Sequence, residues 1–350
     1  MSKVVYLMGA GASYGKREKD SNGKDISGKI LEGLPIVNEI LERLEYVKTL
    51  YAKQIVQEYK EAQQVLIKDL EWLIENTYRH ATIDTFAKKL FLTNQKDEYV
   101  KMKRLLSLFF KTEQLINRPD GRYDTFLASV LQKNDKGKLR ISDEISILTW
   151  NYDSQFEIAY KEYLSAGNYQ ETIDFPEQLG IEIQSSYANF LKPASFVDDG
   201  TRQIFKLNGS ASFIEDYSPA HYYSFNDGEL KNEWVIQLLK IYNSPKQCML
   251  NYAWEHETSS DLKHIFDNSL FKAKALVIIG YTFPFFNREV DSFLFSFICR
   301  NVQTIYIQDP YADNIKESVL NLIRRTGLPV NDKQIILKKD VSQFLLPPEL

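Results

Sequence analysis

Two short apolar runs, each ending at a glycine, constrain the fold of this chain most strongly. Val4–Met8 and Ala275–Ile279 are rich in β-branched and apolar residues, and Gly9 and Gly280 follow them directly. Continuous apolar runs of this length are typical of strands buried on both faces of a parallel sheet. Further strand-like runs alternate with segments of helical periodicity, and they cover residues 144–149, 203–207, 304–307 and 334–337. The alternation predicts an α/β fold with a doubly wound, mostly parallel, Rossmann-like sheet.

About a hundred residues with helical periodicity follow the first predicted strand. Apolar residues recur at helical spacing through this region, as Ile36 and Ile40 illustrate. A large helical insertion after the first strand is the simplest interpretation. The expected organisation is therefore a Rossmann-like domain formed by residues 1–33 and 134–350, with an inserted helical subdomain at 34–133.

Charge and composition exclude several classes of protein. Lys and Arg total 43 against 47 Asp and Glu, and this net charge of −4 disfavours a protein that binds nucleic acid directly. Two cysteines, Cys248 and Cys299, are too few for a four-thiolate zinc site, so we expect no metal. The N-terminus lacks a signal-peptide pattern, and no apolar run approaches the ~18 residues of a membrane span. We expect a cytoplasmic protein that makes no membrane contact.

Four short segments directly follow predicted strands, at residues 9–15, 150–153, 208–210 and 280–284. Because the carboxyl ends of parallel strands meet at one edge of a sheet, we expect these segments to line a common ligand crevice. Small residues in the first segment let the backbone approach a pyrophosphate, and a following helix would offer free N–H donors. Tyr14, however, stands where the dinucleotide-binding fingerprint has its third glycine, which disfavours an ordinary dehydrogenase. A tight turn that binds no ligand is the alternative.

Taken in order, these segments resemble those of the sirtuin-like, NAD-consuming fold. The resemblance lies in GAGAS at 9–13, TWNYD at 149–153, KLNGS at 206–210 and GYTFP at 280–284. It implies that the Rossmann-like domain binds NAD, as substrate or ligand, and that Leu34-Pro35 belongs to a loop that closes over the nicotinamide. The residues that the resemblance assigns to cofactor binding are Gly9, Ala10, Gly11, Ala12, Ser13, Pro35, Gly209, Ser210, Gly280, Tyr281, Thr282 and Asp309.

The resemblance further implies a catalytic set of Asn151, Asp153 and Asn208. Asn151 and Asp153 would act at the nicotinamide end of NAD, and helix capping after the strand is their alternative role. Asn208 departs from the family, which has a histidine there that acts as general base on a ribose hydroxyl. A carboxamide cannot take up a proton near neutral pH, and loss of a general base typically removes ~10²–10⁴-fold of the rate. Either a weakened enzyme or a pocket that binds without turnover is therefore expected.

Four histidines could stand in for the missing base: His80, His221, His256 and His264. His221 follows Asn208 in a Pro-containing loop and could fold back toward the pocket, although an exposed loop position is the simpler interpretation. His80 ends a helical run and is expected to cap it. His256 and His264 do not form the His-Glu-x-x-His pattern of a zinc protease.

The small number of cysteines also bears on which activity of the family is expected. Deacetylases of the sirtuin family carry four zinc-binding cysteines, so the resemblance implies the zinc-free branch. Members of that branch commonly hydrolyse NAD in bacterial anti-phage defence, often together with a partner protein. We expect an NAD hydrolase that releases nicotinamide and forms ADP-ribose. A non-catalytic sensor of NAD or ADP-ribose, and an interaction scaffold that uses the helical insertion as a homo-oligomer interface, remain as alternatives.

Overall fold

The central sheet has seven parallel strands within the part of the chain that the structure describes. The structure is a computed structural model that describes residues 3–17, 30–53, 55–133, 137, 139–166, 181–183, 203–213, 229–255, 272–329 and 333–350. The strand order is β11-β10-β9-β1-β4-β6-β5. The strands are β1 Val4–Met8, β4 Ile145–Thr149, β5 Ile181–Ile183, β6 Ile204–Lys206, β9 Ala275–Ile279, β10 Thr304–Gln308 and β11 Gln334–Lys338. The predicted Rossmann-like α/β fold is confirmed.

Strand β1 lies where the chain changes direction across the sheet. β4 and β6 follow on one side of β1, whereas β9, β10 and β11 follow on the other. Val4 is paired with Ile145 of β4 and with Ala275 of β9, so the three strands are in register. In open α/β sheets the ligand crevice lies at such a switch point, outside the carboxyl ends of the strands. Gly9 and Gly280 flank this position.

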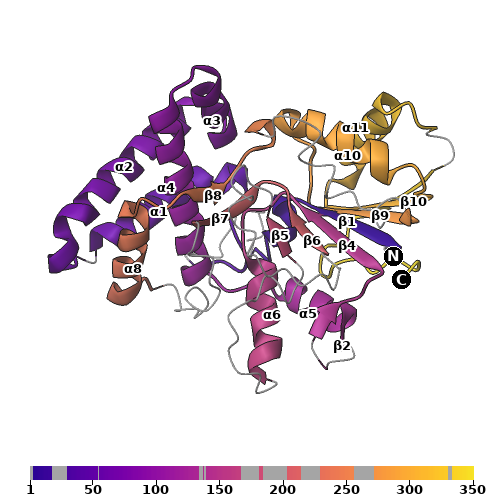
Figure 1. The fold of residues 1–350 in the computed structure, drawn as a ribbon, viewed down its shortest axis with the longest axis horizontal. Helices are drawn as coiled ribbons and strands as arrows, with labels where there is room; N and C mark the ends of the chain where they lie inside the picture. The colour runs from indigo at the N-terminus through magenta and orange to yellow at the C-terminus, as the bar shows by residue number, and fades with distance from the viewer. Residues whose placement is uncertain are drawn as a thin grey trace, which may run out of the picture.

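Helices cover both faces of the sheet, which explains why β1, β4 and β9 are buried at every position (Figure 1). Val5 and Leu7 of β1 face one core, which α10 (Arg288–Ile298) and α11 (Ala312–Arg325) cover. Alternate residues of the same strand, such as Tyr6, face a second core beneath α5 (Gly121–Val130) and α6 (Gln155–Ala166). This alternation is the period-2 geometry of a strand buried on both sides.

The helical insertion forms a third core beside the sheet (Figure 1). Its helices are α1 Ile40–Lys53, α2 Lys60–Arg79, α3 Ile83–Leu92 and α4 Lys96–Ile116. They pack with α8 (Asn232–Asn243) and with an antiparallel pair of strands, β7 (Gly209–Phe213) and β8 (Cys248–Leu250). The large insertion after the first strand is therefore confirmed, whereas the boundary at residue 133 stays a prediction. Helix α5 lies before residue 133 in the chain, but it packs on the sheet and not on helices α1–α4 of the insertion.

Several elements depart from the sequence expectation. The sequence does not predict the antiparallel pair β7–β8 or the short antiparallel pair of β2 (Leu131–Lys133) and β3 (Leu139–Ile141). Residues 262–271, where the sequence predicts a helix, lie outside the described part of the chain. Among the described helices, none combines the length and the apolar character that crossing a membrane requires.

Candidate functional site

The four strand-end segments stand side by side at the carboxyl edge of the sheet, because β9, β1, β4 and β6 are consecutive neighbours. Backbone hydrogen bonds join each segment to the next. The Gly11 N–H donates to Gly280 O at 2.9 Å, and the Trp150 N–H donates to Met8 O at 2.9 Å. The Leu207 N–H donates in the same way to the carbonyl at the end of β4. The expected convergence of these segments is confirmed.

Glycine is required in the first segment because two backbones meet there. A Cβ atom on Gly11 would lie 2.7 Å from the Cα of Gly280, and Gly9 is similarly confined. The N–H groups of Gly9, Gly11 and Ala12 all donate to backbone carbonyls. The helix that follows β1 is a four-residue 3-10 turn at Ala10–Ser13 and not the expected α-helix. These three N–H groups are thus engaged within the protein and are not free donors for a pyrophosphate.

A second pair of glycines joins the first segment to residues 33–35. Gly15 and Gly33 have positive φ angles of 68° and 75°, a conformation that favours glycine. A Cβ atom on Gly33 would lie 2.5 Å from the carbonyl oxygen of Ser13, and the Leu34 N–H donates to the same oxygen at 2.7 Å. Pro35 follows and is buried. The structure therefore brings Leu34 and Pro35 against the glycine segment.

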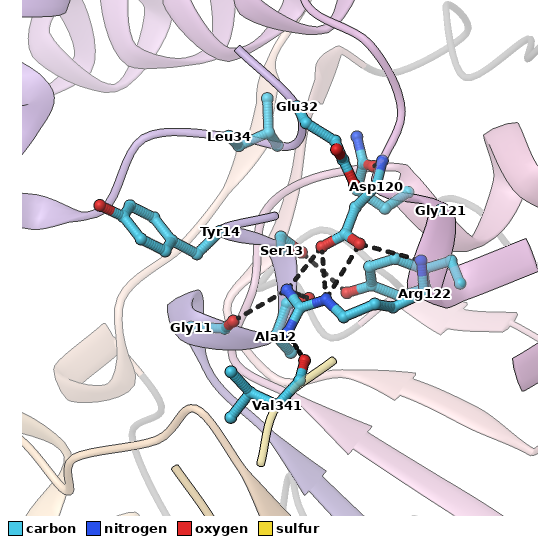
Figure 2. Close-up of polar contacts among 12 residues, drawn as sticks. Gly11, Ala12, Ser13, Tyr14, Glu32, Leu34, Asp120, Gly121, Arg122 and Val341 are labelled. Carbon is cyan, nitrogen blue, oxygen red and sulfur yellow. Dashed lines mark hydrogen bonds and ion pairs between the residues drawn. The ribbon is translucent and has the colours of Figure 1, made fainter. Parts of the chain in front are cut away.

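Arg122 of α5 holds the carbonyl side of the glycine segment in place (Figure 2). Its Nη2 atom donates to Ala12 O at 3.0 Å and to Gly11 O at 3.3 Å, and Nη1 donates to Val341 O at 3.2 Å. The guanidinium also forms a buried ion pair with Asp120, at 2.6 Å. Because Asp120 accepts from the Arg122 N–H as well, it caps α5 and orients the arginine. Sequence reasoning missed this contact: Asp120-Gly121 signals a helix start, but nothing in the sequence identifies the carbonyls that Arg122 meets.

Ser13 is the centre of a buried polar cluster that joins the first and second segments. Its Oγ atom lies 2.7 Å from the Tyr123 hydroxyl and accepts from the Asn151 Nδ2 atom at 3.0 Å. Ser13 also hydrogen-bonds Asp153. All four side chains are buried, and the Tyr123 contribution from α5 was not predicted from the sequence. Three of the predicted site residues are therefore in direct contact.

Asp153 lies beside a buried lysine from the third segment. Burial raises the pKa of the Asp153 carboxyl, and the nearby Lys206 ammonium opposes this rise. Lys206 donates to the carbonyl oxygen of Asp153 and to Glu157 Oε1, each at 2.5 Å. The Asp153 Oδ1 atom accepts from the Gln155 N–H at 3.0 Å, at the start of α6. Asp153 therefore accepts a hydrogen bond from the first residue of α6, as its alternative capping role predicts. It does so beside two further charged side chains, Lys206 and Glu157.

Asn208 has a buried polar atom with no hydrogen-bond partner among the described residues. Its Nδ2 atom donates to Trp150 O at 3.3 Å, whereas Oδ1 accepts from nothing in that part of the chain. The hydroxyl of Ser210 is likewise buried and unpartnered there. Gly209 between them has φ of 72°, which lets β7 pair closely with β8. Buried polar groups are rarely left unsatisfied, so such atoms mark a position where a polar ligand or water fits.

Two carboxylates act on Tyr152, the neighbour of Asn208: Asp84 comes from the helical insertion, and Glu255 comes from the segment after β8. Tyr152, which follows Asn151, has a pKa raised well above its usual value by burial, by Asp84 of α3 and by Glu255, and Asn208 hydrogen-bonds it. Although Asp84 keeps part of its surface exposed, desolvation raises the pKa of its carboxyl to about 6. Glu255 forms a largely buried ion pair with Lys103 of α4, with 2.8 Å between Glu255 Oε1 and Lys103 Nζ. No local sequence pattern connects Asp84 or Glu255 with the strand ends.

The remaining predicted residues, Tyr281, Thr282 and Asp309, are not part of the hydrogen-bonded cluster around Ser13. Tyr281 is buried, and its hydroxyl donates to Asp291 Oδ2 at 2.8 Å, away from the Ser13 cluster. Thr282 is exposed. Asp309 accepts from the Tyr311 N–H at 2.7 Å and so forms the turn before α11. Tyr281 and Asp309 therefore have local structural roles, and their side chains form no hydrogen bond with Asn151 or Asp153.

The histidines add little to this site. His80 is the C-cap residue of α2, as expected, and its Nδ1 atom lies 2.7 Å from Asn76 O. His221, His256 and His264 lie outside the described residues. Within the described part of the chain, the titratable side chains that face Tyr152 and Asn208 are carboxylates and tyrosines.

Comparison with known proteins adds no assignment. A scan against models of protein families gives no match for this chain, and a search of curated proteins gives none. The functional interpretation therefore rests on the geometry of the strand-end segments. Their place at the switch point of the sheet is where α/β proteins bind ligands.

Proposed function

We propose that this chain is a zinc-free, sirtuin-like protein that binds NAD at the strand-end crevice and hydrolyses it. In that reaction the bond between the nicotinamide nitrogen and the ribose C1′ breaks, and its electron pair stays with nicotinamide. A water oxygen bonds to C1′, a proton is released, and ADP-ribose forms. Following the resemblance, the proposed setting is anti-phage defence, with the helical insertion as the surface for a homo-oligomer or a partner protein.

The contact between Ser13 and Asn151 carries this proposal. It joins the glycine segment to the Asn-x-Asp segment through a hydrogen bond of 3.0 Å. Two ordered motifs that are far apart in the sequence thereby become one buried site at the switch point of the sheet. Asp153 supplies a carboxylate next to it, which suits the positive charge that develops on the ribose in the transition state.

Hydrolysis without the family histidine needs another group to accept the proton of water. Asp84 fits this role better than Asn208, because a carboxamide does not titrate and the Asp84 pKa lies near 6. Its charge raises the pKa of Tyr152, which is the neighbour of Asn208. We infer that Asp84 supplies the base from the helical layer.

The test is incubation of the full chain with NAD, followed by chromatography of nicotinamide. We expect release that Asn151→Ala reduces at least 100-fold, in line with loss of a positioning contact at the reacting centre. Asn314→Ala, at an exposed asparagine of α11, is the matched control and should keep the full rate. The absence of nicotinamide above background, for the chain alone and with cell extract from the same source, contradicts the proposal.

A second function is a sensor that binds NAD or ADP-ribose without turnover. The unpartnered Oδ1 atom of Asn208 favours it, because an amide at this position can bind a ribose hydroxyl but cannot deprotonate it. This function predicts a nucleotide-dependent rise in melting temperature, no nicotinamide release, and activity gained by Asn208→His. If neither nucleotide shifts the melting temperature, both functions fail.

A further inference from the structure

A cleft of about 430 Å³ lies beside helices α10 and α11, apart from the strand-end site. Its volume is in the range of sites for small molecules. None of the residues that the resemblance assigns to NAD lines it. Its lining includes Phe283, Arg288 and Asp291 on the α10 side, and Asn321, Arg324 and Arg325 on α11.

The cleft is positively charged, although the chain as a whole has a net charge of −4. Arg288, Arg324 and Arg325 are exposed, and none forms an ion pair with a described residue. Asp291 is the acidic residue of the lining, but it is fully buried and accepts from the Tyr281 hydroxyl. Burial raises the pKa of Asp291 to about 8, so at pH 7 this carboxyl is largely protonated. The arginines therefore face no compensating charge from it.

Helix stability accounts for two of the arginines but not for the third. Arg324 and Arg325 end α11, where positive charge is favourable to the helix dipole. Arg288 is the first residue of α10, where positive charge opposes the dipole. Its guanidinium stacks on the ring of Phe285 at 4.4 Å, which holds it at the cleft.

The backbone at Phe283 is also strained on this side of the cleft. Phe283 has φ of 56°, a left-handed conformation that is rare for a bulky residue. Conformations of this kind cost of order 1–3 kcal/mol and concentrate at ligand sites. The ring packs against Tyr281, at 4.6 Å between centroids, and lines the cleft with a partly exposed aromatic surface.

We propose that this cleft binds a small molecule that carries phosphate groups, at a site separate from the strand-end crevice. The planar guanidinium groups of Arg288 and Arg324 match the geometry of phosphate oxygens. Asn321 accepts from Arg324 at 2.8 Å, which orients that arginine, and Phe283 offers a surface for a flat ring. Pyrophosphate tests the phosphate part of this ligand, and ADP tests the ring as well.

The test is titration calorimetry of the full chain with inorganic pyrophosphate. We expect saturable binding that Arg324→Glu and Arg288→Glu each weaken at least ten-fold. Arg300→Glu, the same change at an exposed arginine after α10 that does not line the cleft, should leave the affinity unchanged. ADP should bind more tightly than pyrophosphate, and Phe283→Ala should remove that difference.

The proposal is overturned if neither probe binds saturably, or if Arg300→Glu and Arg324→Glu weaken binding equally. Asn151→Ala separates this site from the proposed NAD site, since it should leave pyrophosphate binding intact. Loss of pyrophosphate binding in Asn151→Ala, with Arg288→Glu unaffected, also counts against the cleft. Failure of NAD hydrolysis has no bearing on these results.

Discussion

The Oγ atom of Ser13 lies 3.0 Å from the Nδ2 atom of Asn151, although 138 positions separate the two residues in the chain. The contact forms because β1 and β4 are parallel neighbours, so the residues that follow them leave the same edge of the sheet. Tyr123 completes the arrangement from α5, through a hydroxyl 2.7 Å from Ser13. One serine thereby fixes the position of an amide at the switch point of the fold.

Ser13→Ala should destabilise the protein by about 1–3 kcal/mol, because it leaves the buried Asn151 amide and the Tyr123 hydroxyl without a partner. Chemical denaturation measures the loss. Ser129→Ala is the control, since Ser129 is exposed on α5 and its hydroxyl bonds only to the preceding helical turn. That variant should change stability by less than ~0.5 kcal/mol. Equal losses in the two variants argue against a buried cluster around Ser13.

Arg122→Met should cost about 3–5 kcal/mol, because it leaves the Asp120 carboxylate buried without its partner and frees the carbonyls of the glycine segment. Arg79→Met removes an exposed ion pair with Glu75 and should cost less than ~1 kcal/mol. Denaturation curves of both variants give the comparison. The expectation fails if the cost at Arg122 does not exceed the cost at Arg79.

Much of the fold follows from local sequence patterns. Ala275–Ile279 and Val4–Met8 match β9 and β1 residue for residue, because a strand buried on both faces leaves an unbroken apolar run. The antiparallel pair β7–β8 does not follow from such patterns. Gly209–Phe213 is only five residues long and begins with four small residues, and its partner Cys248–Leu250 has three residues. Pairing between such short segments depends on the α4 surface beneath them, which local patterns do not encode.

The candidate site was predictable only in part. Strand ends are visible in the sequence, so the convergence of residues 9–15 with 150–153 followed from the sheet order. Long-range partners were not visible. Arg122 meets carbonyls 110 and 111 positions away, and Asp84 approaches the site from the helical layer. These contacts arise from tertiary packing between the insertion and the sheet, for which a single sequence has no periodic signal.

The stability of the protein should fall as the pH rises from about 4 to about 8, because of Asp291. Its carboxyl has a pKa of about 8 in the folded state against 3.8 ordinarily, since burial disfavours the charged form. Between these values the unfolded chain has released the proton and the folded chain has not, so each increment of pH favours unfolding. Above about 8 both states are ionised and this effect is constant.

Asp291→Asn should remove that part of the pH dependence and stabilise the protein at pH 8 by roughly 2 kcal/mol or more. The difference from the natural chain should shrink toward pH 4. Melting temperatures across this range measure it, with the exposed Asp313→Asn on α11 as the control. A profile that Asp291→Asn leaves unchanged shows that Asp291 is ionised in the folded protein.

Asp84→Asn should separate catalysis from stability at the proposed NAD site. The base form of Asp84 predominates above its pKa of about 6, so nicotinamide release should decline as the pH falls through this value. Asp84→Asn should lower the rate by ~10²–10⁴-fold and abolish the inflection.

Because the folded-state pKa of Asp84 is raised, ionisation of Asp84 costs stability above about pH 4, and the same variant should therefore melt at a higher temperature at pH 7. Misfolding would lower both quantities. Asp97→Asn, at an exposed position in the first turn of α4, should alter neither the rate nor the melting temperature.

Addition of Asn208→His to the Asp84→Asn chain should restore nicotinamide release, because imidazole then supplies a base beside Tyr152. Full activity in Asp84→Asn assigns the proton transfer to another group.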